Sequence, residues 1–271
     1  MKIALLQTPV SSVKEDNLIC AGEYIHCAAK AGVDMAVLPE MFCCPYSNDY
    51  FAEFAEPAFG RVWNFLSDEA EKHGIYLVGG SIPESEDGKI YNTSFVFDRK
   101  GEQIARHRKV HLFDIDIVGG QRFFESDTFA AGSDVTLFDT QFGRLGLCIC
   151  FDLRFPELTR LMALGGAKMI IVPAAFNMTT GPMHWELLFR QRAVDDQLFT
   201  AGIAPARDEN GVYVSYANSM ICSPWGKVLA RADKGAEIIT ATIDFDEVGN
   251  TRDQLPLLSA RRDDVYRLEM A

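Results

Sequence analysis

The sequence predicts one α/β domain over residues 1–271, with mixed sheets covered by helices on their outer faces. Strand-like apolar runs alternate with stretches of helical periodicity along the chain. No linker, repeat or low-complexity segment divides the 271 residues, which suffice for one closed core. The middle of the chain is rich in strands, which favours two sheets over a single doubly wound sheet.

The first third of the chain alternates strands with helices. Residues 2–7 form the first expected strand, and a helix is expected from Val13 to Ala31. Its apolar face consists of residues spaced by three or four: Leu18, Ala21, Ile25 and Ala28. A buried strand over 34–38 is followed by Pro39 and Glu40, and a helix near 61–73 leads into a strand over 75–82.

The remaining elements follow the same reasoning. Strands are expected over 91–97, 103–110 and 135–140, and a further strand-like run begins at Arg144 and reaches Cys150. Pro156 suits the first turn of a helix, since its missing N–H would have no partner there. An apolar run over 169–175, a helix over 183–197 and three or four strands within 199–243 complete the domain. The tail, residues 257–271, offers few core candidates.

Composition excludes several functional classes. The net charge of −12 argues against nucleic acid and anionic membranes as partners, and an anionic substrate would need a local cation. No apolar run approaches the roughly 20 residues of a membrane span. Seven cysteines, without a secretory signal, favour reduced thiols and a cytoplasmic location. Zinc is a weaker alternative, because the cysteine spacings are not those of usual metal ligands.

Cys150 occupies a position suited to a nucleophile. It ends a strand-like run and precedes the helix that begins at Pro156. Backbone N–H groups and the positive end of a helix dipole at such a turn are expected to lower the pKa of a thiol and to bind an oxyanion. A small buried apolar residue is the ordinary alternative for a free cysteine.

Two further residues at strand ends complete a possible catalytic set. Glu40 follows a buried strand, and Lys109 lies where a strand enters a loop. A carboxylate, an ammonium and a thiol can together attack an amide carbonyl. Solvated surface positions are the ordinary alternative for Glu40 and Lys109. A Cys–His pair is a rival arrangement, whose candidate bases are His107, His111 and His184.

Three segments resemble the motifs of the nitrilase superfamily, the carbon–nitrogen hydrolases. They are Leu38-Pro39-Glu40, Arg108-Lys109-Val110-His111-Leu112 and Cys150-Phe151-Asp152-Leu153-Arg154-Phe155-Pro156-Glu157. The resemblance implies a four-layer α-β-β-α sandwich of two mixed sheets flanked by helices, with no metal and no organic cofactor. It implies a homodimer or higher homo-oligomer, with contacts expected from the tail 257–271. It also implies Glu40 as base, Lys109 for the tetrahedral intermediate, Cys150 as nucleophile and Glu125 as a second carboxylate.

Other segments look like the omega-amidase branch of that superfamily. They are residues 173–186, 190–197 and 205–208. This resemblance implies hydrolysis of 2-oxoglutaramate and 2-oxosuccinamate to ammonia and a 2-oxo acid. Arg154 is expected to bind the distal carboxylate of a small anionic amide. Thr180 is a candidate donor, and Tyr46 a candidate wall of the pocket.

Several alternatives stay open. Arg154 could instead form a structural ion pair with Asp152 or Glu157. Thr180 could be a turn hydroxyl, and Tyr46 could serve only core packing. The substrate could instead be deaminated glutathione or an N-carbamoyl amine or amino acid, and the chain could be a catalytically silent binding subunit. Phe151 stands where Tyr is expected, and Cys148 where a smaller residue is usual.

Overall fold

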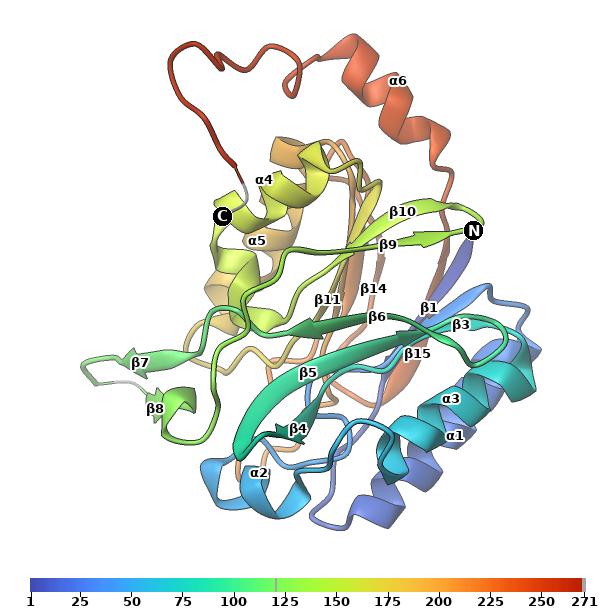
Figure 1. Ribbon diagram of the computed structural model, residues 1–271, viewed down its shortest axis with the longest axis vertical. Coiled ribbons are helices and arrows are strands. Elements are labelled where there is room, and N and C mark those ends of the chain that lie inside the picture. Colours follow the sequence, from blue (N-terminus) through green and yellow to red (C-terminus); the bar gives the residue numbers. More distant parts are fainter. Residues whose placement is uncertain (120, 270–271) are drawn as a thin grey trace.

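The computed structural model describes residues 1–119 and 121–269 and contains two large β-sheets (Figure 1). The strands of the first sheet are β1 (Lys2–Gln7), β2 (Met35–Val37), β3 (Tyr76–Val78), β4 (Ile82–Glu86), β5 (Lys89–Phe97), β6 (Gln103–Arg108) and β15 (Glu237–Thr242). Their hydrogen-bonded order is β15-β1-β2-β3-β5-β4, with β6 paired to β5. β1, β2 and β3 run parallel, and β15 pairs antiparallel with β1.

The second sheet has the order β14-β13-β12-β11-β10-β9. Its strands are β9 (Thr136–Thr140), β10 (Gly143–Leu147), β11 (Met169–Pro173), β12 (Phe199–Ile203), β13 (Met220–Cys222) and β14 (Val228–Arg231). β10, β11 and β12 run parallel, and the outer pairs are antiparallel. A separate hairpin of β7 (Asp114–Asp116) and β8 (Arg122–Phe124) projects from the body of the molecule (Figure 1).

Side-chain alternation along the strands creates three apolar layers. Ile3 and Leu5 of β1 point into a core shared with Ile171 of the facing sheet. The intervening Ala4 and Leu6 belong to a second core, together with buried residues of the helices α1 (Lys14–Lys30) and α3 (Arg61–His73). This is the period of two that a strand buried on both faces requires.

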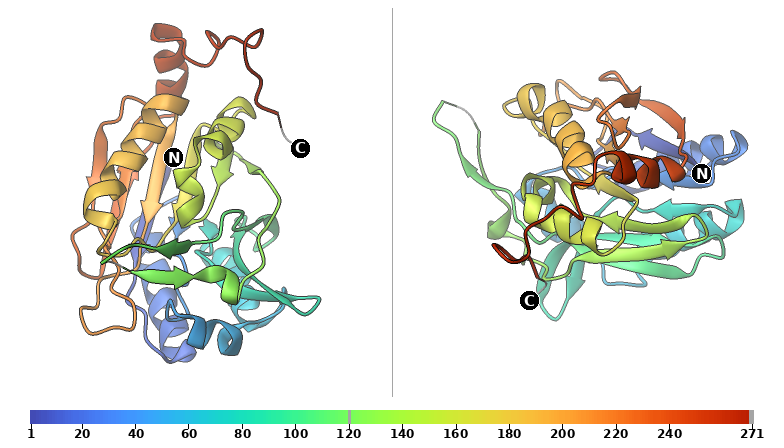
Figure 2. Two further views of the ribbon diagram at one scale, coloured as in Figure 1. Left: turned by 90° about the vertical axis from the view of Figure 1, so that its left-hand side faces the viewer. Right: turned by 90° about the horizontal axis from the view of Figure 1, so that it is seen from above.

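The second sheet repeats the arrangement on its outer face. Ile170 and Val172 of β11 pack with α4 (Pro156–Leu164) and α5 (Gly181–Asp196), whose buried residues include Met162 and Trp185. Helices therefore cover the outside of each sheet, and the two sheets face each other (Figures 1 and 2). The predicted four-layer α-β-β-α sandwich of two mixed sheets is confirmed.

One expected strand differs from the structure. The strand expected over 75–82 is wrong: β3 ends at Val78, and β4 begins at Ile82. Gly80 between them has φ +58°, where an added Cβ would overlap the carbonyl oxygen of Pro39. The chain therefore turns at a glycine to leave room for the segment that carries Glu40.

Some elements have no counterpart in the sequence prediction. These are α2 (Asn48–Phe54), the β7–β8 hairpin and α6 (Asp246–Gln254). After α6 the chain passes back toward α4 without a further helix or strand in its described residues (Figure 1). The role of the tail in dimer contacts stays a prediction, and residues 270–271 lie outside the described part. All seven cysteines are free thiols, and none of the described helices is long and apolar enough to cross a membrane.

Candidate active site

Glu40 lies at the carboxyl end of β2, in a turn that neighbouring segments hold in place. The N–H of Ser81 donates to the carbonyl of Pro39 (3.2 Å), and the hydroxyl of Ser81 accepts from the N–H of Met41 (3.1 Å). Met41 has φ +52°, a left-handed conformation rare outside glycine. These contacts direct the carboxylate of Glu40 inward, where it is fully buried.

Lys109 bridges two buried carboxylates. It follows β6 directly, and its Nζ donates to Glu40 Oε1 and to Glu125 Oε1, both at 2.9 Å. Glu125 begins the 3₁₀ turn η1 (Glu125–Asp127) after β8, and its other oxygen accepts from the N–H of Phe113 at 2.6 Å. Burial lowers the pKa of Lys109, but the charges of Glu125 and Glu40 outweigh it and raise the pKa above its ordinary value. Lys109 is therefore a firmly charged cation.

Tyr46 belongs to the same network. Its hydroxyl donates to Glu125 Oε1 at 2.5 Å and lies 3.4 Å from the Nζ of Lys109. The ring is buried, and it packs against Phe51 and Tyr213, with centroids 5.5 and 4.7 Å away. Tyr46 thus both walls the site and fixes Glu125.

Asn92 is a member of this cluster that the sequence reasoning missed. It lies on β5 with no exposed surface, and its Nδ2 donates to Glu40 Oε1 at 2.8 Å. Lys109 bonds to the same oxygen, so Glu40 Oε2 has no hydrogen-bond partner among the described residues. Burial and the charge of Glu125 raise the pKa of Glu40, although Lys109 opposes them. The free oxygen of Glu40 is therefore disposed to accept a proton.

Cys150 lies beyond the end of β10, in a 3₁₀ turn, η2 (Cys150–Arg154), rather than at the end of a strand. Its φ of +47° is strained for a non-glycine residue, and such strain clusters at functional sites. The expected lowering of its pKa is wrong. Burial and then the charge of Glu40 raise the pKa of the thiol well above its ordinary value, and Lys109 and the N–H of Ala175 offset only part of this. The thiol therefore needs a base.

The histidines are bonded elsewhere than to Cys150. His107 Nε2 lies 3.0 Å from Asp152 Oδ2, and His111 Nδ1 lies 2.8 Å from Asp152 Oδ1. His184 Nδ1 accepts from Arg154 Nη1 at 3.0 Å. The Cys–His alternative therefore has no contact in the described structure to support it.

Arg154 ends the turn that begins at Cys150 and forms no ion pair with any described residue. Asp152 makes its hydrogen bonds to His107, His111 and backbone N–H groups, so the alternative pair with Asp152 or Glu157 does not form. The guanidinium lies over the ring of Phe176, 4.7 Å from its centroid. Burial lowers the pKa of Arg154, and Cys150 and Tyr213 act against this.

Thr180 takes no part in the network around Lys109. Its hydroxyl and its N–H both bond to Asn177 Oδ1, at 3.0 and 2.9 Å, in the turn that begins α5. The turn hydroxyl is thus the interpretation that its contacts support. No group of three or more His, Cys, Asp or Glu side chains among residues 1–119 and 121–269 is arranged to hold a metal ion.

Comparisons with known proteins identify the family. Residues 2–253 match the carbon–nitrogen hydrolase family model. The chain belongs to the carbon–nitrogen hydrolase family. An omega-amidase of Xenopus laevis is 46% identical over 268 residues, which cover 99% of this chain and 97% of that protein. The omega-amidase of Homo sapiens is 45% identical over 269 residues, covering 99% and 98%.

A solved structure agrees with this assignment. The crystal structure of a Saccharomyces cerevisiae member of branch 10 of the nitrilase superfamily matches with a TM-score of 0.89 and 41% sequence identity. The match covers 97% of this chain and 96% of that chain. The likeness therefore extends over the whole sandwich.

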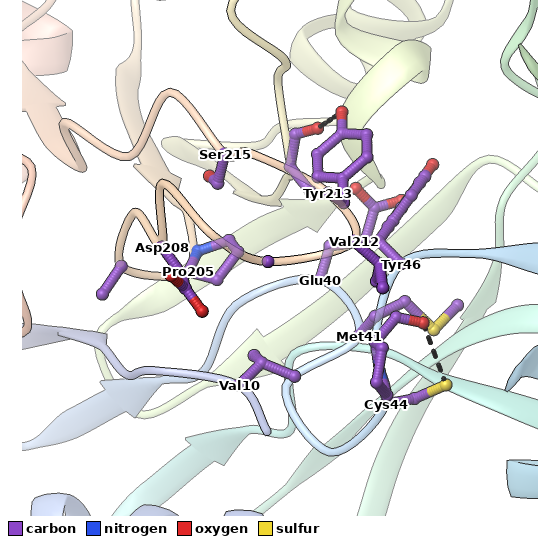
Figure 3. A pocket seen from close by; sticks show the side chains of 14 residues that line it. Val10, Glu40, Met41, Cys44, Tyr46, Pro205, Asp208, Val212, Tyr213 and Ser215 are labelled. Carbon is purple, nitrogen blue, oxygen red and sulfur yellow. Dashed lines mark hydrogen bonds between the residues drawn. The ribbon is translucent and has the colours of Figure 1, made fainter. Parts of the chain in front are cut away.

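A cavity leads from the surface of this carbon–nitrogen hydrolase to Glu40 and Tyr46 (Figure 3). It encloses about 470 Å³, its open mouth included. Pro205, Asp208 and Val212 line the wall formed by the loop after β12. Tyr213 from this loop donates its hydroxyl to the carbonyl of Ala175 and stands beside Tyr46 (Figure 3). Tyr213 is a second site residue that the sequence reasoning missed.

The two departures from the family pattern lie in apolar surroundings. The Phe151 ring packs edge-on against Phe113 and Phe155, with centroids 5.2 and 5.5 Å away. Cys148 is fully buried in the core shared with α4 and α5. Neither residue makes a contact in the network around Lys109.

Proposed function

We propose that this carbon–nitrogen hydrolase is an omega-amidase, which cleaves the terminal amide of 2-oxoglutaramate and 2-oxosuccinamate. The products are ammonia and the 2-oxo dicarboxylic acid. Two independent observations support the proposal: the full-length similarity to omega-amidases, and the guanidinium of Arg154, which ends the η2 turn begun by Cys150 and pairs with no carboxylate among the described residues. The second observation carries the substrate class.

The first half of the reaction forms a thioester. The free Oε2 of Glu40 takes the proton of the Cys150 thiol, and the sulfur attacks the amide carbon. The carbonyl oxygen becomes an oxyanion, which the ammonium of Lys109 stabilises. As the intermediate collapses, Glu40 returns the proton to the leaving nitrogen. Ammonia departs, and the acyl group stays on Cys150.

The second half hydrolyses the thioester. Glu40 takes a proton from a water molecule, the hydroxide adds to the acyl carbon, and Lys109 again faces the oxyanion. Collapse breaks the carbon–sulfur bond, and the proton on Glu40 returns to the thiolate of Cys150. Glu125 and Tyr46 do not react in this scheme. They hold Lys109 in place through the contacts described above.

Arg154 gives the site its selectivity for an acidic substrate. A guanidinium that is half-buried and has no carboxylate partner is costly, unless a ligand supplies the negative charge. The distal carboxylate of a 2-oxo dicarboxylic monoamide fits this requirement through a bidentate pair. In a chain of net charge −12, such a local cation is what an anionic substrate needs.

A substrate panel tests the proposal. Ammonia release is measured with 2-oxoglutaramate, 2-oxosuccinamate, deaminated glutathione and N-carbamoyl amines, with Cys150→Ala as the inactive control. The 2-oxo acid monoamides should have the highest kcat/KM. A preference for N-carbamoyl substrates would contradict the omega-amidase assignment, and activity that survives Cys150→Ala would contradict the mechanism.

Arg154→Ala tests the selectivity separately. Loss of a charge-assisted pair should raise KM for 2-oxoglutaramate by about tenfold to a hundredfold, and KM for an uncharged amide of similar length should change little. Arg144→Ala, which removes an exposed arginine of β10 paired with Asp139, is the matched control. An equal rise in KM for charged and uncharged amides would show that Arg154 is structural.

We further propose a homodimer in the cytoplasm. The outer face of α5 presents Met183, Leu187 and Val194 beside Trp225, an apolar patch suited to a second copy of the chain. Seven free thiols suit a reducing compartment. Light scattering on the purified protein should give twice the monomer mass, and Leu187→Glu should lower it. Cell fractionation tests the location.

A further inference from the structure

Arg154 has one side-chain hydrogen-bond partner in the described residues, the imidazole of His184. Arg154 Nη1 donates to His184 Nδ1 at 3.0 Å. The two residues are 30 positions apart, one at the end of the η2 turn and the other in the first turn of α5. This contact therefore joins the segment of the nucleophile to the helix that covers the second sheet.

The contact defines the protonation state of His184. A guanidinium only donates hydrogen bonds, so Nδ1 of His184 must offer a lone pair and its proton must lie on Nε2. Burial and the charge of Arg154 both lower the pKa of His184. The N-terminal end of α5 also disfavours a cation at this position. His184 is thus a neutral acceptor at neutral pH.

The surroundings restrict the guanidinium on its other sides. Phe176 lies beneath it, with the ring centroid 4.7 Å away, and the Phe151 ring centroid is 5.7 Å away. Burial lowers the pKa of Arg154, and the thiol of Cys150 and the phenol of Tyr213 act against this. The guanidinium has five N–H donors, of which one is used by His184, so a pair of donors remains for a carboxylate.

We propose that His184 is a positioning residue for Arg154, and that it sets the selectivity for an anionic substrate without touching the reacting atoms. The neutral imidazole holds the guanidinium over Phe176 in the orientation that receives the distal carboxylate. A flexible side chain that is already held loses less entropy when the ligand binds. This inference rests on the proposed function, because it concerns the carboxylate that Arg154 binds.

The effect of removing His184 follows from that entropy. Immobilising one long side chain at a binding site corresponds to about a two- to tenfold change in affinity. His184→Ala should therefore raise KM for 2-oxoglutaramate by about that factor, with kcat within about twofold of the wild type. KM for an uncharged amide of similar length should not change, because its binding does not use Arg154.

Three further variants make the test specific. His184→Asn keeps an acceptor oxygen close to the place of Nδ1 and should restore most of the affinity for 2-oxoglutaramate. The double variant Arg154→Ala/His184→Ala should be no worse than Arg154→Ala alone, since both residues then act through one interaction. Thr179→Ala, an exposed change in the loop before α5, is the matched control. His184→Leu replaces His184→Ala if the alanine variant unfolds.

The outcomes separate this inference from the proposed function. An equal rise in KM for charged and uncharged amides in His184→Ala would overturn the positioning role and leave the omega-amidase proposal intact. A His184→Asn variant whose KM for 2-oxoglutaramate is as high as that of His184→Ala would do so too. An unchanged KM in His184→Ala would do the same. A wild-type enzyme that hydrolyses uncharged amides but not 2-oxoglutaramate would overturn both.

Discussion

Replacing Asp152 with Asn should strongly destabilise the fold. Asp152 lies two residues after Cys150 and is completely buried. Its Oδ1 accepts from the backbone N–H and from the Nδ1 of His111, at 2.9 and 2.8 Å. Its Oδ2 accepts from the N–H of Ile149 and from Nε2 of His107, both at 3.0 Å. The carboxylate thus joins the turn that begins at Cys150 to the two histidines on either side of Lys109.

The size of the effect follows from the number of donors. An asparagine offers one acceptor oxygen, so it can keep one pair of these hydrogen bonds, and its NH₂ group would face the donors of the other pair. Each hydrogen bond to a charged group contributes about 1.5–3 kcal/mol. Loss of two therefore gives about 3–6 kcal/mol, in line with the roughly 3–5 kcal/mol for breaking a buried charged network. His107 Nδ1 lies 2.8 Å from the hydroxyl oxygen of Thr136. If the proton of His107 moved to Nδ1 and was donated to Thr136, the loss would fall at the lower end of this range.

The pH dependence has a definite sign. Burial alone raises the pKa of Asp152, but the hydrogen bonds from His107 and His111 outweigh it and hold the pKa below its ordinary value. The unfolded carboxyl titrates near pH 3.9. The stability that the ionised carboxylate contributes is therefore complete above about pH 5 and is lost as the pH falls through the folded pKa. The difference between the wild type and Asp152→Asn should shrink in acid.

Urea denaturation, monitored by circular dichroism, measures the free energy of unfolding and its dependence on pH. At pH 7 the midpoint for Asp152→Asn should fall by about 1 M or more, and at pH 3 the gap should narrow. Asp139→Asn, an exposed aspartate paired with Arg144, is the control and should leave the midpoint unchanged. The reasoning would be refuted if Asp152→Asn lowered the free energy of unfolding by less than about 1 kcal/mol at pH 7. A difference between the two proteins that stayed constant down to pH 3 would refute it as well.

Two other substitutions test the buried cluster. Lys109→Met should lower kcat by about a hundredfold to a thousandfold. Burial already raises the pKa of Glu40, and loss of the ammonium raises it further. The variant should therefore be more stable at pH 5 than at pH 8, because ionising Glu40 at the higher pH disfavours the folded state. A urea midpoint independent of pH would contradict this. Gly80→Ala should cost at least about 1–2 kcal/mol, since φ is +58° and the Cβ would overlap Pro39. Its kcat should fall with the displacement of Glu40, and a kcat equal to that of the wild type would contradict the role given to this turn.

The positions of Glu40 and Lys109 could be predicted because both follow strands that the sequence marks clearly. Parallel strands that end at one edge bring such residues together. The strands of Glu40 and Cys150, however, lie in different sheets. Strand periodicity does not specify how two sheets face each other, so the proximity of these residues came from the resemblance to the family.

Other features were missed for reasons that can be stated. Asn92, Thr93 and Ser94 are consecutive polar residues on a strand and are all fully buried. Three polar residues within an apolar strand were the available signal for a site at that place. Tyr213 lies in an irregular loop without periodicity, so nothing in the sequence located it. The positive φ of Cys150 is equally hidden, because a non-glycine residue gives no sign of it.

The charges of the site fall into two sets with different tasks. Lys109 is already matched by Glu40 and Glu125 at 2.9 Å, so it cannot also bind the carboxylate of a substrate at little cost. Arg154 has no such partner in the described chain, and it is the cation left for a ligand. Loss of Arg154 should therefore change which amides bind and leave the reacting groups in place. Under the proposed function, substrate class and bond cleavage are separable in this site, as expected where one fold carries several related activities.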